Sequence, residues 1–350
     1  MNYNKSASET QINFNKLMSY MNTGCEHKEC FYHKCSEKVI SAHSIQNNRI
    51  LNQISDNGDV LAFNTSFDDK DLLIHDLNKV GRKKASTFLG FCNKHDTDIF
   101  KPIELFDYKN GDLEQNFLFA YRSLAKEYSA KMSAYNLYKK LKVINTSDLD
   151  EIYKKLNIKR SVKITEDRKE IISQFYHGTS DSVGFLNNLR IEMNINLIKK
   201  KFSKISSYII EIPEEYPFAL SSMFLIQKDV EGNTINDLSL FQNLKPTFLT
   251  IFPQNGKSNI IISYRRKDKN YFKFIEDQIL SENMDIQKKI LSNIITYYVE
   301  NIFISPIWWN NLDESYRKDY VEMFNKTIMS FPDSLFFDKE LNIFKNYSDN

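Results

Sequence analysis

The cysteines and histidines of this chain are gathered in one short stretch near its amino-terminal end. Residues 25 to 96 hold all four cysteines and five of the six histidines, and the sixth histidine is His177. The nine clustered residues are Cys25, His27, Cys30, His33, Cys35, His43, His75, Cys92 and His95. Cysteines that only fill a core would be spread along the chain, so this segregation predicts a metal site.

Two pairs in this stretch have the spacing of structural zinc ligands. Cys92 and His95 are separated by two residues, and Cys30 and Cys35 are separated by four. A structural zinc takes four ligands, which commonly arrive as two pairs from separate turns. We therefore predict structural Zn²⁺ bound by Cys30, Cys35, Cys92 and His95. In the competing set Cys25 replaces Cys30, and buried free cysteines would explain single residues but not their clustering.

Composition sets the class of protein. A chain of 350 residues exceeds the size at which one core usually stops growing, so we expect two or three subdomains. A hydrophobic content of 41% and an aromatic content of 13% argue against global disorder. The net charge of +2 neither requires nor excludes a nucleic-acid partner, because a basic face can lie within a neutral total.

The length of the apolar runs bears on where in the cell the protein is expected. No run approaches the about 20 apolar residues that span a bilayer. The start, MNYNKSASETQINF, has no apolar core after a basic segment, so we expect no signal peptide and no membrane partner. A cytoplasmic protein keeps its thiols reduced, which favours metal over disulfide at the clustered cysteines.

Hydrophobic periodicity predicts an α+β protein in three regions. Residues 1–105 are expected to form a zinc-stabilised ββα-type module, residues 106–205 a helical middle, and residues 206–350 a mixed β-sheet with helices for recognition. The expected strands are 38–42, 60–63, 85–91, 208–212, 222–226, 248–252 and 259–264. The expected helices are one through 12–21, 45–54, a short one that stops before Pro102, 112–143, one from 147, 167–202 with a break near 177, 271–303, and one from 313.

The chain is expected to have a histidine at the end of a strand, then a second strand, then a helix that opens at a Cys-x-x-His pair. This order resembles that of the HNH nucleases, also called ββα-metal or His-Me finger nucleases. The resemblance covers residues 25 to about 104. It is carried by the two cysteines at 30 and 35, by Ala42-His43, and by Cys92-x-x-His95-Asp96. In that family the strand-end histidine activates water, and a helix residue after the second zinc pair binds a divalent ion on the scissile phosphate.

The resemblance implies roles for two residues that are not among the predicted zinc ligands. His43 would be the general base, and Asp96 would bind catalytic Mg²⁺ or Mn²⁺ at the place where the family usually has histidine or asparagine. The chain departs from the family at its central asparagine, where Ser86 and Thr87 stand, and a long insertion separates the two halves. The Gly-Gly and Lys elements of the family are absent.

A second resemblance extends over most of the chain. A group of bacterial proteins without an established activity is similar to it in five segments. These are Ser41-Ala42-His43-Ser44-Ile45-Gln46, Phe88-x-Gly90-Phe91-Cys92-x-x-His95-Asp96, Phe100-x-Pro102-Ile103-Glu104, Glu300-Asn301 and Ser305-Pro306-x-Trp308-Trp309. This likeness implies that the module at residues 25 to about 104 is a real structural unit, but it implies no activity.

Four further features have two interpretations each. Gln46 would orient His43 or touch a base, or it is only a polar residue at a helix start. Glu104 would complete a metal site or only precede the next helix. The basic run 82–84 would meet phosphates or lie in a solvated loop. The tryptophans 308 and 309 are best interpreted as a packing anchor rather than a base-stacking platform.

The preferred function at this stage is a metal-dependent endonuclease that hydrolyses phosphodiester bonds of nucleic acid. By analogy alone, its setting would be defence against phage or mobile elements. The alternative is a non-catalytic zinc module that binds nucleic acid or a partner protein, including a second copy of the chain. A third hypothesis is a regulatory subunit whose carboxy-terminal region carries specificity.

Overall fold

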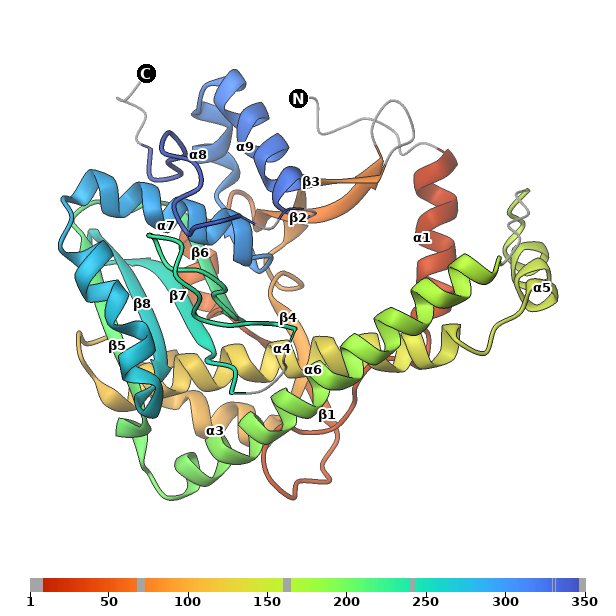
Figure 1. Ribbon diagram of the computed structural model, residues 1–350, viewed down its shortest axis with the longest axis horizontal. Coiled ribbons are helices and arrows are strands. Elements are labelled where there is room, and N and C mark those ends of the chain that lie inside the picture. Colours follow the sequence, from red (N-terminus) through yellow and green to blue (C-terminus); the bar gives the residue numbers. More distant parts are fainter. Residues whose placement is uncertain are drawn as a thin grey trace.

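The computed structural model describes residues 9–67, 73–159, 165–239, 243–328, 330 and 332–345. It is a mixed α+β protein, as the sequence predicts, with a large sheet, a small sheet and long helices (Figure 1). Among the described residues, no helix combines the length and the apolar character that a membrane crossing requires.

The large sheet is antiparallel throughout, in the order β3-β2-β9-β6-β7-β8-β5. Its strands are β2 (Asp59–Phe67), β3 (Leu73–Gly81), β5 (Ile205–Ile212), β6 (Phe218–Phe224), β7 (Thr247–Gln254), β8 (Lys257–Arg265) and β9 (Ile302–Ile304). Strands β7 and β8 are consecutive in the chain and pair as a hairpin. Asn255 and Gly256 both have positive φ there, as a tight two-residue turn between strands requires. The sheet takes two strands from the first predicted region and five from the third.

Helices cover both faces of this sheet. The helices are α1 (Glu9–Asn22), α2 (Asn52–Ile54), α3 (Asn93–Glu104), α4 (Leu113–Leu141), α5 (Thr146–Leu156), α6 (Glu166–Ile198), α7 (Met284–Tyr298), α8 (Pro306–Asn311) and α9 (Glu314–Thr327). Shorter helical turns are η1 (Asn47–Leu51), η2 (Phe202–Lys204), η3 (Arg266–Phe272) and η4 (Ile275–Leu280). In Figure 1 the long helices α4 and α6 run side by side, and α7 lies on the other side of the sheet.

The strands alternate between two cores because successive side chains point to opposite faces. On β7, Leu249 and Ile251 face the core that includes α7, whereas Phe248 and Phe252 face the core that includes α3 and α4. Both faces are buried, which explains why this strand is almost continuously apolar in sequence. The small sheet packs into the core on the α4 side.

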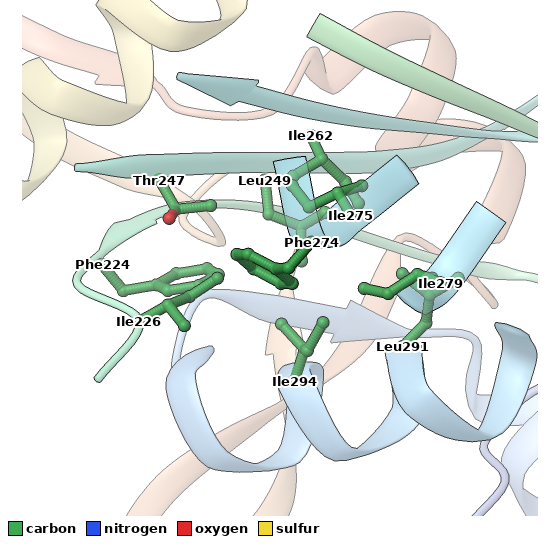
Figure 2. Close-up of a pocket in the computed structure, with 10 residues that line it drawn as sticks. All are labelled: Phe224, Ile226, Thr247, Leu249, Ile262, Phe274, Ile275, Ile279, Leu291 and Ile294. Carbon is green, nitrogen blue, oxygen red and sulfur yellow. The ribbon is translucent and has the colours of Figure 1, made fainter. Parts of the chain in front are cut away.

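The space between the sheet and α7 is a filled core. Figure 2 shows side chains from the strands converging with those of η4 and α7, for example Leu249, Ile275 and Ile294. The cavity among them has a volume of about 10 Å³ and is lined almost entirely by apolar groups. A single water needs about that much space and several polar partners, so this cavity is a packing gap.

The helices differ from the expectation at several points. The helical stretch expected to reach residue 303 ends at Tyr298, and Ile302–Ile304 pair as strand β9. Helix α3 continues through Pro102 to Glu104, although the sequence predicts a stop before the proline. The proline removes one hydrogen bond close to the end of the helix, and burial of Phe100 and Ile103 in the core holds the last turn. Helix α6 is unbroken at Gly178, where a helix-interior glycine costs only about 1 kcal/mol.

Candidate metal centre and the adjoining His43 site

The candidate metal centre lies where a small two-stranded sheet meets a helix. Strands β1 (Val39–His43) and β4 (Thr87–Cys92) pair in antiparallel fashion, and α3 begins immediately after β4. Cys92 is the residue before the helix and His95 lies in its first turn. The segment that carries Cys30 and Cys35 is fastened to β4, since Phe31 N–H donates to the Gly90 carbonyl at 2.7 Å.

Four side chains come together at this junction. The ligand atoms of Cys30, Cys35, Cys92 and His95 all lie within 4.8 Å of one another. The Cys35 and Cys92 sulfurs are 3.8 Å apart, and the Cys30 sulfur is 3.5 Å from Nδ1 of His95. Tetrahedral zinc with bonds of about 2.3 Å to sulfur and about 2.0–2.1 Å to nitrogen requires separations of about 3.8 and 3.5 Å. The quartet can therefore hold a metal ion, and its geometry is compatible with zinc.

The competing set with Cys25 is not the one that the fold brings together. The Cys25 sulfur donates to the carbonyl of Met21 at the end of α1, and it does not belong to the group of four. His27 is buried against the ring of Tyr128 instead. His75 lies on β3 in the large sheet. Clustering in sequence therefore overstates the size of the site.

Burial determines the protonation states of two of the four side chains. Burial raises the pKa of the Cys30 thiol to about 12, so this sulfur needs a nearby cation to become a thiolate at neutral pH. Burial is also the main cause that lowers the pKa of His95, which keeps its imidazole neutral. Arg190 supports the segment by donating to the Cys30 and Phe31 carbonyls, at 3.0 and 2.9 Å. Thiolate and neutral imidazole are ligands for a soft or borderline cation such as Zn²⁺.

His43 ends strand β1, as the sequence predicts, and lies opposite Thr87 of β4. Its Nδ1 is 3.1 Å from the carbonyl oxygen of Ala85 and 3.2 Å from the Ser86 hydroxyl. A carbonyl can only accept, so Nδ1 carries the proton and Nε2 of the neutral ring has a free lone pair. Burial is the main cause that lowers the pKa of His43, so the ring is neutral at pH 7. This is the form that a general base requires.

Ser86 holds the turn beside His43 in an uncommon backbone conformation. Its φ is +58°, and its carbonyl accepts from the backbone N–H of Ser44 at 2.9 Å. The serine hydroxyl faces the imidazole of His43. The Ala85 carbonyl and the Ser86 hydroxyl both contact Nδ1 of His43, and these two contacts orient the ring.

Helix α3 presents two carboxylates on the same side. Asp96, Phe100 and Glu104 follow one another at intervals of four residues and share a face. Burial is the main cause that raises the pKa of Asp96, while Arg122 of α4 lowers it and Glu104 raises it. The same Glu104 and Arg122 also act on the pKa of His43, with opposite signs. The two charged side chains are thus close enough to influence both His43 and Asp96.

Gln46 and Glu104 are connected by the fold. The Gln46 side chain donates to the backbone carbonyl of Glu104, and the Glu104 carboxylate accepts from Arg122 at 2.6 Å. Gln46 thus binds the end of α3. In the basic run near β3, the Arg82 guanidinium donates to the backbone and side-chain oxygens of Asn47 in η1. The tryptophans 308 and 309 are buried in the α7-side core, which confirms them as a packing anchor.

Arg122 is the residue that sequence reasoning missed. It is the only charged residue between positions 115 and 125, in a helix segment that is otherwise apolar or neutral. A lone charge in a buried helix is the signal that could have found it. No protein-family model, curated protein or solved structure matches the chain. The geometry of the site is therefore the basis for a functional assignment.

Proposed function

We propose that this protein is a metal-dependent nuclease that hydrolyses phosphodiester bonds of nucleic acid at His43. The observation that carries the proposal is the contact of His43 Nδ1 with the Ala85 carbonyl, which leaves Nε2 as a base. The order of β1, β4 and α3, with a candidate metal centre at their junction, supports it as the arrangement that the HNH resemblance implies. Nε2 would accept the proton of the attacking water.

In this proposal the quartet of Cys30, Cys35, Cys92 and His95 holds a structural zinc. The ligands join the segment before β1 to the junction of β4 and α3, which is the frame that carries His43 and Asp96. A closed four-ligand site has no open position for substrate, so its contribution is to position the frame.

Asp96 would hold a second, catalytic cation. A carboxylate is a hard oxygen ligand of the type that Mg²⁺ and Mn²⁺ prefer. When bound, such an ion would stabilise the charge that develops on the scissile phosphate.

One observation favours a second candidate function, a non-catalytic zinc module that binds nucleic acid or a partner protein. The guanidinium of Arg122 already places a positive charge among the carboxylates, and it lowers the pKa of Asp96 as a cation would. A site that is neutralised in this way has less attraction for a divalent ion. Activity with and without Mg²⁺ therefore separates the two candidates.

The test compares wild-type protein with the His43→Ala variant. His33→Ala is the matched control, because His33 is an exposed histidine of the same segment that is not part of the quartet. Each protein is incubated with plasmid, single-stranded DNA or RNA in the presence of Mg²⁺ or Mn²⁺, and its zinc content is measured. We expect cleavage by wild type and His33→Ala and at least about 100-fold slower cleavage by His43→Ala, with equal zinc. Equal cleavage by His43→Ala, or no cleavage by wild type under all conditions, would refute the nuclease.

A further inference from the structure

Arg122 is a charged side chain buried at the edge of the His43 site. It lies on α4, and only 4% of its side-chain surface is exposed. The guanidinium carbon is 4.3 Å from the centre of the Phe100 ring of α3, so the ring covers one face of the cation. A guanidinium taken out of water in this way must be compensated by acceptors or anions.

The compensation that the protein supplies is incomplete. Nη2 of Arg122 donates to Oε1 of Glu104 at 2.6 Å. The buried Nε has no hydrogen-bond acceptor among the described residues. Arginine frequently binds a carboxylate or phosphate through two parallel N–H groups, whereas in the part of the chain that the structure describes a carboxylate oxygen contacts Arg122 through Nη2 alone. Arg122 can therefore donate to a further oxyanion oxygen.

The position of Arg122 connects this unused donor to the candidate site. Phe100 lies between Asp96 and Glu104 on one face of α3, so the guanidinium over its ring packs against the face of α3 that carries both carboxylates. The Glu104 that binds Arg122 is also bound, at its backbone carbonyl, by the Gln46 side chain from the segment that follows β1. The unused N–H thus belongs to the surroundings of the proposed base.

An open groove gives a polyanion access to the partner of Arg122. The groove has a volume of about 630 Å³ and is lined by Glu104 together with Gln46, Arg49 and Phe106. The Glu104 side chain is 36% exposed, so the ion pair lies at the boundary between core and solvent. Phe106 is 63% exposed beside it, as is suitable for contact with a base.

We infer that Arg122 is the phosphate-binding residue of this site and that Glu104 holds its guanidinium until a backbone phosphate of single-stranded nucleic acid takes its place. The inference rests on the proposed function for the identity of the ligand. Binding requires no covalent step: a phosphate oxygen accepts from Nε and Nη2, and Glu104 turns toward the groove. An ion pair that only stabilises the fold would not exchange partners in this way.

The experiment measures binding separately from cleavage. Variants are made on a His43→Ala background, and a fluorescein-labelled short oligothymidylate is titrated without added Mg²⁺ by fluorescence anisotropy. Its counterpart with neutral methylphosphonate linkages reports binding that does not depend on phosphate charge. Lys139→Gln is the matched control, because it removes one exposed positive charge from the same helix at about 25 Å from Arg122.

The two partners of the ion pair should change affinity in opposite directions. We expect Arg122→Gln to weaken binding of the anionic oligonucleotide by about tenfold or more, and Glu104→Gln to strengthen it several-fold, since a competing anion is removed. The neutral oligonucleotide should bind all variants alike, and Lys139→Gln should resemble the parent. Should Arg122→Gln not fold, Arg122→Lys keeps the charge without the planar fork, and an intermediate loss is expected.

Parallel loss of affinity in the Arg122 and Glu104 variants, or no change in either, would overturn the inference and leave a structural ion pair. Failure of the proposed function is a different result. If wild-type protein cleaves no nucleic acid while the two variants still change affinity in opposite directions, Arg122 binds phosphate in a non-catalytic module.

Discussion

Loss of the quartet should lower the stability of the chain by a predictable amount. A metal ion held by Cys35 and Cys92 would join positions that are 57 residues apart in sequence. In the chain-entropy model of a cross-link, closing a loop of that length in the unfolded chain is worth about 4 kcal/mol. With an unfolding entropy of about 2.1 cal/mol/K per residue over 350 residues, this corresponds to about 6 °C in Tm if the chain unfolds as one unit.

The assay is thermal unfolding of the purified protein, followed by circular dichroism, together with metal content measured by mass spectrometry. We expect one zinc per chain and a Tm lower by about 6 °C after chelation or in Cys92→Ser. Cys25→Ser is the matched control, because Cys25 is also buried but does not belong to the quartet. It should retain the metal. Loss of metal from Cys25→Ser with retention in Cys92→Ser, or chelation that removes the metal without changing Tm, would refute the ligand set.

Two further predictions concern His43 and the connection between the two sheets. NMR titration should place the pKa of His43 below the 6.5 of a free histidine. The Glu104 carboxylate raises this pKa, so Glu104→Gln should lower it further. The Arg122 guanidinium lowers this pKa, so Arg122→Gln should raise it. Since the folded pKa lies below the unfolded one, the His43 contribution to stability should be present above pH 6.5 and lost as pH falls through the folded pKa. Asn301 donates to a buried carbonyl of β6 and to the Ser44 hydroxyl beside His43. Asn301→Ala should therefore lower the free energy of unfolding, measured in urea, by about 1–3 kcal/mol. Asn310→Ala, at an exposed asparagine, is the control and should change stability little.

The local parts of the candidate site were predictable because each depends on a few neighbouring residues. The short strand predicted at 38–42 delivers His43 at its end, and β1 ends at His43. The Cys92–His95 spacing places two ligand side chains at the junction of a strand and a helix, which is where they lie. The roles of His43 and Asp96 remain predictions, because geometry alone does not measure activity.

The parts that were missed depend on partners far away in the chain. Strand β3 was not predicted, and its register comes from pairing with β2 along its whole length. Pro102 was taken as a helix end because sequence does not show the burial of Phe100 and Ile103 that holds the last turn of α3. Each of these features is stabilised by a tertiary contact rather than by local propensity.

By itself the sequence determined the α+β class, the two pairs of metal-type ligands and the strand-end histidine, because hydrophobic period and ligand spacing are local properties. Only the tertiary structure decided that Cys30 rather than Cys25 joins the quartet, and that Arg122 of α4 faces the carboxylates of α3. Distances between segments that are tens of residues apart result from packing of the whole core, and no local pattern encodes them. The buried charge of Arg122 acquires a meaning only from the side chains that surround it.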